Sequence, residues 1–248
     1  MTSYNPLGPL VLAGSGEYTP AMDIVDRYLT ERCTGPVILI ATSCAQEGAD
    51  MMTKWEQMGV EHFARLGIEA TPLRIVDNAD ANSEEKASVI ETAAVVWFSG
   101  GSPPYLAQSF HNTASWVALE AANRRGAAVA GASGGLGVLN DHMVFPDVTA
   151  EPAPNALGLA APVRAMAHFD RMEQRRPEAL QRILASLQPG QMAVGVDEDT
   201  AVVWTDGEWR AMGHKRVVVF KDGQRENYAN GDLVPSLPPP FRALPNER

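Results

Sequence analysis

A serine at position 133 has the surroundings that a nucleophile needs. It lies in the sequence GASGG (131–135), which fits the pattern GxSxG and directly follows the apolar run 127–131. A serine on a tight turn between a buried strand and a helix projects its hydroxyl from the edge of a sheet, and small neighbours permit the strained backbone. The amide of Gly134 would then point toward a developing oxyanion. Glycine-rich turns that only pack two elements share this pattern, so other residues must decide.

Two further glycine-rich turns follow apolar runs. The sequence SGGS (99–102) comes after the run 93–98 and before two prolines that suit the first turn of a helix. Its glycines allow the backbone to approach a ligand closely and to supply a second oxyanion donor. The sequence GSGE (14–17) is not GxGxxG, and no acidic residue follows at the distance that binds a ribose, so we expect no dinucleotide site.

A general base must come from the histidines, which are His62, His111, His142, His168 and His214. His168 lies between the long proline-containing loop expected over 145–163 and a helix, and loop positions on a rigid scaffold favour function. Spacing alone favours His168 only slightly over His142. The acid that orients the histidine is either one of Asp197, Glu198 and Asp199, at the end of an expected strand, or Asp170, two residues after His168. The residues alone leave this choice open.

The elements that must position these residues alternate along the chain. Short apolar runs indicate strands at 9–14, 36–41, 68–75, 93–98, 127–131, 192–196, 201–204 and 216–220. Helical spacing indicates helices at 21–32, 50–66, 83–92, 103–110, 114–125 and 176–187. Buried strands that alternate with helices predict an α/β fold with a mostly parallel, doubly wound sheet, and functional sites at the carboxyl ends of its strands.

The end of the chain follows a different pattern. Turns at Asp206-Gly207 and Asp222-Gly223 predict β-hairpins there. We therefore expect residues 1–230 to form a single α/β hydrolase-type domain. Residues 231–248, which contain three consecutive prolines, are expected to be an extended or disordered tail.

Composition excludes several classes of partner. The chain has 248 residues and a formal net charge of −10, which argues against nucleic acid and anionic membrane as partners. Its two cysteines form no CxxC pair and no zinc-ligand spacing, so no metal is expected. The first twelve residues do not resemble a secretory signal, and no apolar run is long enough to span a bilayer. We expect a cytoplasmic protein without a cofactor.

Four short stretches, in this order, resemble the cyanophycinase and aspartyl dipeptidase (dipeptidase E) family of serine peptidases. They are FSGG (98–101), GASGG (131–135), HF (168–169) and GVDEDTA (195–201). The family's fold is similar to that of class I glutamine amidotransferases, and the likeness extends from the first strand to about position 220. It implies Ser133 as nucleophile, His168 as general base and Glu198 as the orienting acid. It also implies that the amides of Gly101 and Gly134 form the oxyanion hole.

The resemblance also implies a substrate class. A short peptide or isopeptide is expected, with an aspartyl residue on the acyl side. Arg164 and Arg171 flank His168 and would pair with the carboxylate of this aspartyl residue, unless they are ordinary solvent-facing arginines. Ser102 stands where relatives carry a side chain that helps to hold substrate. Cyanophycinases have Asp-Gln where this chain has Met-Ala at 166–167, so cyanophycin itself is not expected as substrate. A homodimer is expected from family likeness alone.

Two other functions remain alternatives at this stage. A glutamine amidotransferase needs a cysteine in the elbow, whereas Cys33 and Cys44 lie elsewhere in the chain. A ligand-binding or regulatory protein that kept the fold without turnover is the second alternative, because the elbow reads Ser-Gly-Gly where the family usually has Ser-Ala-Gly.

Overall fold

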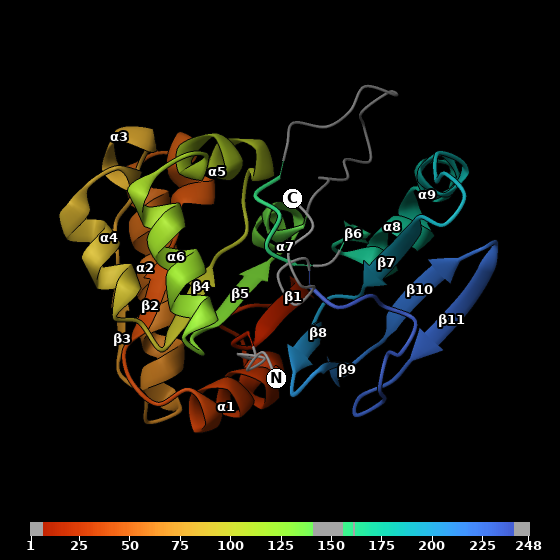
Figure 1. The fold of residues 1–248 in the computed structure, drawn as a ribbon, viewed down its shortest axis with the longest axis horizontal. Coiled ribbons are helices and arrows are strands. Elements are labelled where there is room, and N and C mark those ends of the chain that lie inside the picture. Colours follow the sequence, from red (N-terminus) through yellow and green to blue (C-terminus); the bar gives the residue numbers. More distant parts are fainter. Residues whose placement is uncertain (1–6, 141–155, 161, 241–248) are drawn as a thin grey trace, which may run out of the picture.

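The computed structural model describes residues 7–140, 156–160 and 162–240, which form two β-sheets and the helices around them (Figure 1). The larger sheet has seven strands in the order β3-β2-β4-β5-β1-β8-β9. Its strands are β1 (Leu10–Ser15), β2 (Val37–Ile40), β3 (Ala70–Pro72), β4 (Val95–Phe98), β5 (Ala128–Ala132), β8 (Thr200–Thr205) and β9 (Glu208–Gly213). The first five in chain order are parallel, and the β8–β9 hairpin adds two antiparallel strands beside β1.

Helices cover both faces of the parallel strands, which explains why β2 and β4 are buried along their whole length. On one face lie α1 (Asp23–Arg32) and α2 (Ala49–Arg65), where Leu29 and Phe63 pack against Trp97. The other core cluster includes apolar residues of α3 (Asn78–Ala81), α4 (Glu84–Glu91), α5 (Pro103–Phe110), α6 (Ala114–Arg124) and α7 (Gly134–Leu139). The predicted α/β fold with a mostly parallel sheet is therefore confirmed.

Short helices complete this part of the fold: α3 (Asn78–Ala81) and the 3₁₀ turns η1 (Pro20–Met22) and η2 (Thr42–Glu47). Within the described part of the chain, no helix has the length and apolar character needed to cross a membrane.

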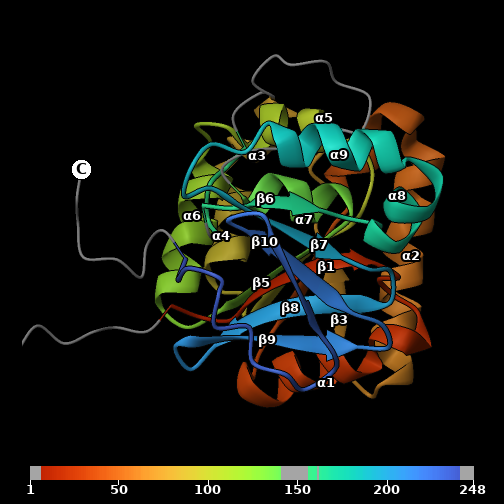
Figure 2. The same cartoon turned by 90° about the vertical axis from the view of Figure 1, so that its right-hand side faces the viewer.

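A second sheet lies at the other side of the molecule, in front in Figure 2, with the order β11-β10-β7-β6. Its strands are β6 (Arg164–Met166), β7 (Met192–Val196), β10 (Val217–Lys221) and β11 (Gln224–Tyr228). Strands β6 and β7 are parallel, and the remaining pairs are antiparallel. Helices α8 (Phe169–Arg175) and α9 (Pro177–Ala185) pack on it through Phe169 and Leu180. The hairpins were expected from their turns, but a separate sheet was not.

The two sheets meet at the end of β1. A Cβ atom on Gly14 would lie 2.2 Å from the carbonyl oxygen of Asp197, so only glycine allows this approach. The carbonyl of Gly14 accepts a hydrogen bond from the amide of His168 at 3.2 Å, and the amide of Asp199 donates to the carbonyl of Ser15 at 3.0 Å. The glycine-rich turn after β1 therefore joins the sheets, and it brings the segments after β6 and β7 to the edge of the large sheet.

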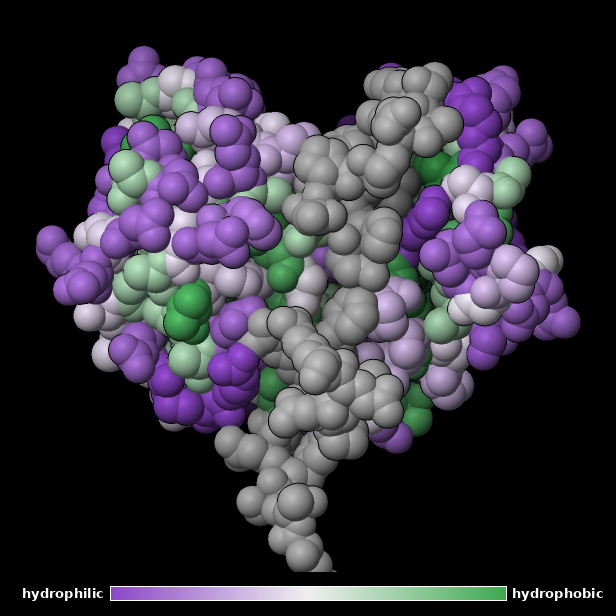
Figure 3. Space-filling model, turned by 45° about the horizontal axis from the view of Figure 1, so that its top comes forward, coloured by the Kyte–Doolittle hydropathy of each residue, from purple (hydrophilic) through white to green (hydrophobic). Residues whose placement is uncertain are grey.

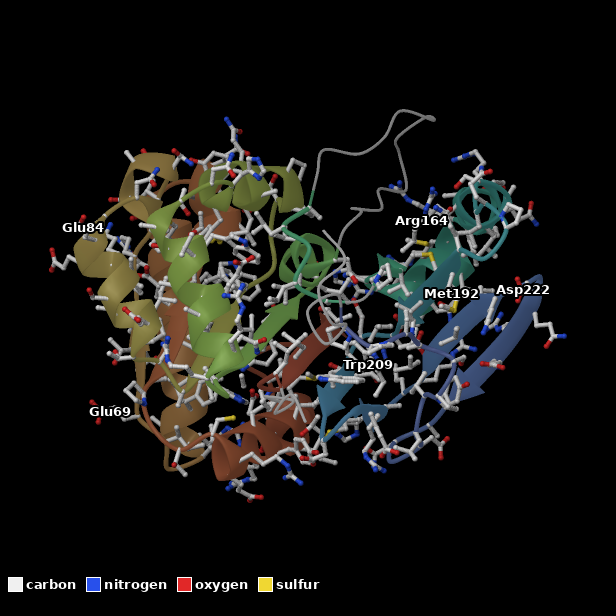
Figure 4. The ribbon with its side chains drawn as sticks, in the orientation of Figure 1. Glu69, Glu84, Arg164, Met192, Trp209 and Asp222 are labelled. Atoms are coloured by element: carbon white, nitrogen blue, oxygen red, sulfur yellow. The ribbon has the colours of Figure 1, made fainter. Side chains whose placement is uncertain are left out.

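Residues 232–240, the described part of the segment expected to be an extended or disordered tail, pack against the fold. The side chains of Val234 and Leu237 are buried, and the amide of Val234 donates to the carbonyl of Trp209 at 2.8 Å. Trp209, labelled in Figure 4, donates from its indole nitrogen to the carbonyl of Pro238 at 2.8 Å. The apolar residues of this segment cover strand β9, which contains Trp209, and this contact holds the segment in place. Residues 241–248, and most of the loop expected over 145–163, lie outside the described residues.

Candidate active site

Ser133 occupies a strained turn between β5 and α7. Its backbone has φ 50° and ψ −106°, in the positive-φ region that residues with a side chain rarely adopt. The amide of Ser133 donates to the carbonyl of Ala13 at 3.0 Å, and its carbonyl accepts from the amide of Gly137 at 3.2 Å. A Cβ atom on Gly131 would lie 2.5 Å from the carbonyl carbon of Gly135. Small residues are thus required around this serine, as in a nucleophile elbow.

His168 and Glu198 approach Ser133 from the second sheet. The Oγ atom of Ser133 lies 2.8 Å from Nε2 of His168, and Nδ1 of His168 lies 2.7 Å from Oε1 of Glu198. His168 follows β6 and Glu198 follows β7, and the carboxyl ends of these parallel strands share one edge. His168 has φ 48° and ψ 39°, a left-handed conformation at the start of α8. The two sheets therefore each supply part of a serine–histidine–glutamate arrangement.

Asp170, the rival to Glu198, has other partners. Its Oδ1 accepts a hydrogen bond from the amide of Glu198 at 3.2 Å, and its Oδ2 accepts one from Nζ of Lys215 at 2.6 Å. Burial alone would raise the pKa of Asp170, but the hydrogen bonds from Lys215 and Glu198 and the charge of Lys215 hold the pKa below its ordinary value. Asp170 therefore holds the backbone of Glu198 in place, and it does not bind the imidazole. Asp197 instead accepts a hydrogen bond from Arg216 at 3.0 Å.

The other histidines of the described residues lie away from Ser133. His62 is buried against Asp26, His111 ends α5, and the amide of His214 donates to the carbonyl of Asp199. His142 lies outside the described residues.

Two backbone amides lie beside the nucleophile. Gly101 has φ 140°, and Gly134 is the first residue of α7. A Cβ atom on Gly134 would lie 2.5 Å from the carbonyl oxygen and 3.1 Å from the amide nitrogen of Gly101. In this chain the backbone of Gly101 therefore leaves no room for a side chain at position 134. Amides held close together at a helix start are suited to stabilise an oxyanion.

A cavity of about 440 Å³ opens at Ser133. It is lined by Gly101, Pro103, Ser133, Gly134, Leu136, Gly137, Ala165, Ala167, His168, Arg171, Met172, Arg175 and Arg176. The floor is thus mainly apolar, and three arginines from the start and end of α8 line one side. Nε of Arg171 lies 2.9 Å from Oε1 of Glu198, the oxygen that also binds His168. The space-filling view shows hydrophobic residues near the middle of this face, with hydrophilic residues toward its outer sides (Figure 3).

Two residues expected to hold substrate do not line this cavity. Arg164, labelled in Figure 4, donates from Nη1 to Oγ of Ser186 at 2.6 Å. Arg164 therefore lies on β6 beside the end of α9, outside the lining of this cavity. The hydroxyl of Ser102 caps α5 by accepting a hydrogen bond from the amide of Tyr105 at 3.4 Å. Its role is therefore to begin the helix that follows the glycine loop.

Glu17 belongs to this site, although sequence reasoning considered its turn only for nucleotide binding. Its side chain is buried after β1, and Oε1 accepts a hydrogen bond from the amide of Gly100 at 2.8 Å. Burial raises the pKa of Glu17, while the hydrogen bond from Gly100 and the charge of His168 act in the opposite direction. An acidic residue two positions beyond a buried strand was the available signal. Among the described residues, no group of three His, Cys, Asp or Glu side chains could hold a metal ion.

The chain is similar to known peptidases. The family model "Peptidase family S51" matches residues 10–212. A cyanophycinase of Geminocystis herdmanii is 23% identical over 96% of this chain and 89% of its own length. A cyanophycinase of Synechococcus elongatus is 27% identical over 69% of this chain, which spans 56% of that relative.

Solved structures show the same fold. A crystal structure of a peptidase from an acI-B1 Actinobacterium has 28% identity and a TM-score of 0.82, and the match covers 93% of this chain and 97% of that one. A putative peptidase E from Listeria monocytogenes has 17% identity and a TM-score of 0.61, over 85% of this chain and all of that one, and supports the fold alone. The family match covers most of the chain, and we conclude that this protein is a serine peptidase that belongs to peptidase family S51.

Proposed function

We propose that the protein hydrolyses a short peptide or isopeptide with Ser133 as nucleophile, His168 as general base and Glu198 as the orienting acid. The observation that carries this proposal is the continuous line of contacts from the Ser133 hydroxyl through both nitrogens of His168 to Glu198, at the mouth of a cavity. Nucleophile, base and orienting acid within hydrogen-bond distance of one another are the arrangement that acyl transfer through serine requires.

The reaction begins when Nε2 of His168 takes the proton of Ser133 as Oγ attacks the substrate carbonyl carbon. The amides of Gly101 and Gly134 donate hydrogen bonds to the oxyanion that forms. His168 then gives its proton to the leaving amine as the carbon–nitrogen bond breaks, which leaves an acyl group on Ser133. Water attacks this acyl group while His168 takes the water's proton, and the acid product leaves as Ser133 regains its proton.

Glu198 keeps His168 in the required state. Its Oε1 accepts the Nδ1 hydrogen of the imidazole, so the lone pair of Nε2 faces Ser133, and its charge stabilises the imidazolium that forms. The carboxylate of Asp170 accepts a hydrogen bond from the backbone amide of Glu198. Nε of Arg171 donates to Oε1 of Glu198, the oxygen that also binds His168. These contacts fix the carboxylate from two sides.

The cavity favours a small substrate with negative charge. Its volume of about 440 Å³ is within the usual range for a small-molecule site. Arg171 and Arg175 line it together with Arg176, and guanidinium groups bind carboxylates strongly. Ala165 and Ala167 give the β6 side no polar side chain. We therefore propose an acyl residue with a free carboxylate, such as an aspartyl residue, as the preferred substrate group.

Labelling with a fluorophosphonate probe tests the nucleophile. The wild-type protein should be labelled, and Ser133→Ala should not, because the probe bonds to an activated serine hydroxyl. Labelling of Ser133→Ala at another serine, or no labelling of the wild type, would contradict the proposal.

A dipeptide library then tests the substrate class. It compares dipeptides with aspartyl or glutamyl first residues and β-aspartyl linkages against neutral dipeptides of the same length. Faster hydrolysis of the acidic members is expected. Equal rates for acidic and neutral members would remove the proposed role of the arginines and leave the nucleophile unaffected.

A further inference from the structure

Buried side chains hold the two consecutive peptide units around Gly100, which are Ser99–Gly100 and Gly100–Gly101. On one side, the amide of Gly100 donates to Oε1 of Glu17 at 2.8 Å. On the other side, the hydroxyl of Ser43, in the 3₁₀ turn η2 after β2, lies 2.6 Å from the carbonyl oxygen of Gly100 and 2.8 Å from that of Ser99. Both side chains are almost completely buried. Neither has a part in the reaction described above.

These contacts determine where the amide of Gly101 points. The peptide is trans, so its carbonyl oxygen and its N–H group point in opposite directions. Since Ser43 binds the carbonyl oxygen of Gly100, the N–H of Gly101 must point away from the Ser43 hydroxyl. The next amide, that of Ser102, donates to the carbonyl of Ser43 at 2.7 Å and fixes the far end of the loop.

The loop needs such contacts because its own residues do not restrict it. Two consecutive glycines have more backbone freedom than any other pair, and Gly101 adopts φ 140°, which suits glycine alone. If this peptide turned over, a carbonyl oxygen would replace the amide that faces the oxyanion. The position is close to the chemistry, since a Cβ atom on Gly100 would lie 2.9 Å from Oε1 of Glu17 and 3.6 Å from Oγ of Ser133.

We infer that Glu17 and Ser43 are positioning residues for the amide of Gly101. Glu17 holds the Ser99–Gly100 peptide, and Ser43 holds both this peptide and the Gly100–Gly101 peptide, in the orientation that directs the amide of Gly101 at the oxyanion. They act through backbone hydrogen bonds, Glu17 as an acceptor and Ser43 as a donor. This inference rests on the proposed function, because it needs an oxyanion beside Ser133.

The test measures the second-order rate of fluorophosphonate labelling at Ser133, which depends on the same oxyanion donors. Ser43→Ala removes the hydroxyl, and Glu17→Met removes the acceptor at similar size. Each should lower the rate about 10- to 100-fold, since loss of one oxyanion donor costs about 10²- to 10³-fold. Because both variants act on the orientation of one amide, the double variant should lose less than the product of the two single losses, and no more than about 10³-fold in rate.

Two conservative variants separate positioning from general damage. Glu17→Gln keeps an acceptor oxygen without the charge, and it should label at close to the wild-type rate. Thr42→Val is the control for Ser43→Ala, because the buried Thr42 hydroxyl donates to the carbonyl of Ile75 at 2.6 Å, away from the loop. It should lower the melting temperature by a similar amount and leave the labelling rate unchanged. If either Ser43→Ala or Glu17→Met does not fold, the other still decides.

The outcomes distinguish this inference from the proposed function. Failure of the wild-type protein to label at Ser133 would overturn the proposed function itself. Normal wild-type labelling with folded Ser43→Ala and Glu17→Met variants within threefold of that rate would overturn the positioning role alone. If Glu17→Gln lowers the labelling rate as much as Glu17→Met, the effect of Glu17 is due to its charge and not to its hydrogen bond. If Thr42→Val lowers the labelling rate as much as Ser43→Ala, the effect of Ser43→Ala is due to general destabilisation.

Discussion

Two histidine–carboxylate pairs among the described residues have nearly the same separation and different surroundings. His168 and Glu198 are 2.7 Å apart at the cavity, where their side chains are 37% and 14% exposed. His62 on α2 and Asp26 on α1 are 2.8 Å apart in the core between α1, α2 and the large sheet, where both side chains are 1% exposed. Sequence and pair distance alone do not distinguish them.

The second ring nitrogen explains the difference. Nδ1 of His62 lies 3.1 Å from Nη2 of Arg65, and a guanidinium group can only donate hydrogen bonds. Nδ1 must therefore accept, and Nε2 carries the hydrogen donated to Asp26, so this ring has no lone pair left for a substrate. His168 has the opposite arrangement, because Glu198 takes the Nδ1 hydrogen and the lone pair of Nε2 faces the Ser133 hydroxyl. The neighbour of the second nitrogen, more than the carboxylate, makes a histidine a base.

The buried pair has a structural role. Asp26 also accepts a hydrogen bond from the indole of Trp97 at 2.9 Å, so one carboxylate connects α1, α2 and β4. The ring of Tyr18 lies 6.1 Å from that of His62 and 6.3 Å from that of Trp97, and its hydroxyl is 3.1 Å from Oγ of Ser99. Tyr18 thus connects the His62–Asp26 pair with Ser99, at the start of the glycine loop of the site.

Glutamine at the two histidine positions should give opposite results. His168→Gln removes the base, and its peptidase activity should fall on the order of 10⁶-fold with little change in melting temperature. His62→Gln should keep activity within about threefold, since it does not touch the reacting groups, but should melt at a lower temperature. Initial rates on the best dipeptide and thermal melts check both. Substantial activity in His168→Gln would remove the distinction between the pairs.

The next largest effect is expected at Glu198. Glu198→Gln keeps the size of the side chain but lets the amide donate to Nδ1, which favours the tautomer with its hydrogen on Nε2. The activity should fall on the order of 10⁴-fold, by analogy with triad acids in other serine peptidases. The matched control is Asp170→Asn, which touches only the backbone of Glu198 and Lys215. An effect of Asp170→Asn larger than that of Glu198→Gln would make Asp170 the more important acid.

Sequence patterns predicted the large sheet well because its strands are continuous apolar runs between helices. The hairpins were also predictable, since Asp206-Gly207 and Asp222-Gly223 both adopt the positive φ that such turns require. The second sheet was not, because β6 has three residues and β7 pairs with β10 across the whole β8–β9 hairpin. Periodicity reports local structure and does not reveal pairing between distant strands.

The site shows the same limit. The motif around Ser133 identified a candidate nucleophile, but spacing alone did not choose between His168 and His142 or between Glu198 and Asp170. The choice came from resemblance, and the folded chain brings Ser133, His168 and Glu198 together. Ser43 gave no signal of its own, and Glu17 gave only its position two residues beyond a buried strand, because their contacts exist only where the segments after β1, β2 and β4 meet.

His62→Ala should have the largest effect on stability. It removes the hydrogen-bond donor of a fully buried carboxylate and leaves a cavity, so the free energy of unfolding should fall by about 3 kcal/mol. Urea denaturation at neutral pH measures this. His214→Ala serves as the control, because His214 is exposed and should change stability by less than about 0.5 kcal/mol. Equal losses in the two variants would show that the buried pair contributes little.

The smallest effect is a shift in titration. Burial raises the pKa of Asp26 above its ordinary value of 3.8, although the hydrogen bonds from His62 and Trp97 oppose this. The indole N–H of Trp97 donates to that carboxylate, so its NMR resonance should titrate with a midpoint above 3.8. The indole of Trp209 donates to a backbone carbonyl and should not follow this titration.

The sign of the linked stability follows from the same shift. Because the folded pKa of Asp26 is the higher one, the contribution of this carboxyl to folding is complete below about pH 3.8 and decreases as the pH rises through its folded value. A midpoint at or below 3.8 for Trp97 would mean that His62 and Trp97 outweigh burial. The surroundings of the His62–Asp26 pair would then favour the ionised carboxylate. Burial would in that case not make the electrostatics of this pair differ from those of the more exposed His168–Glu198 pair.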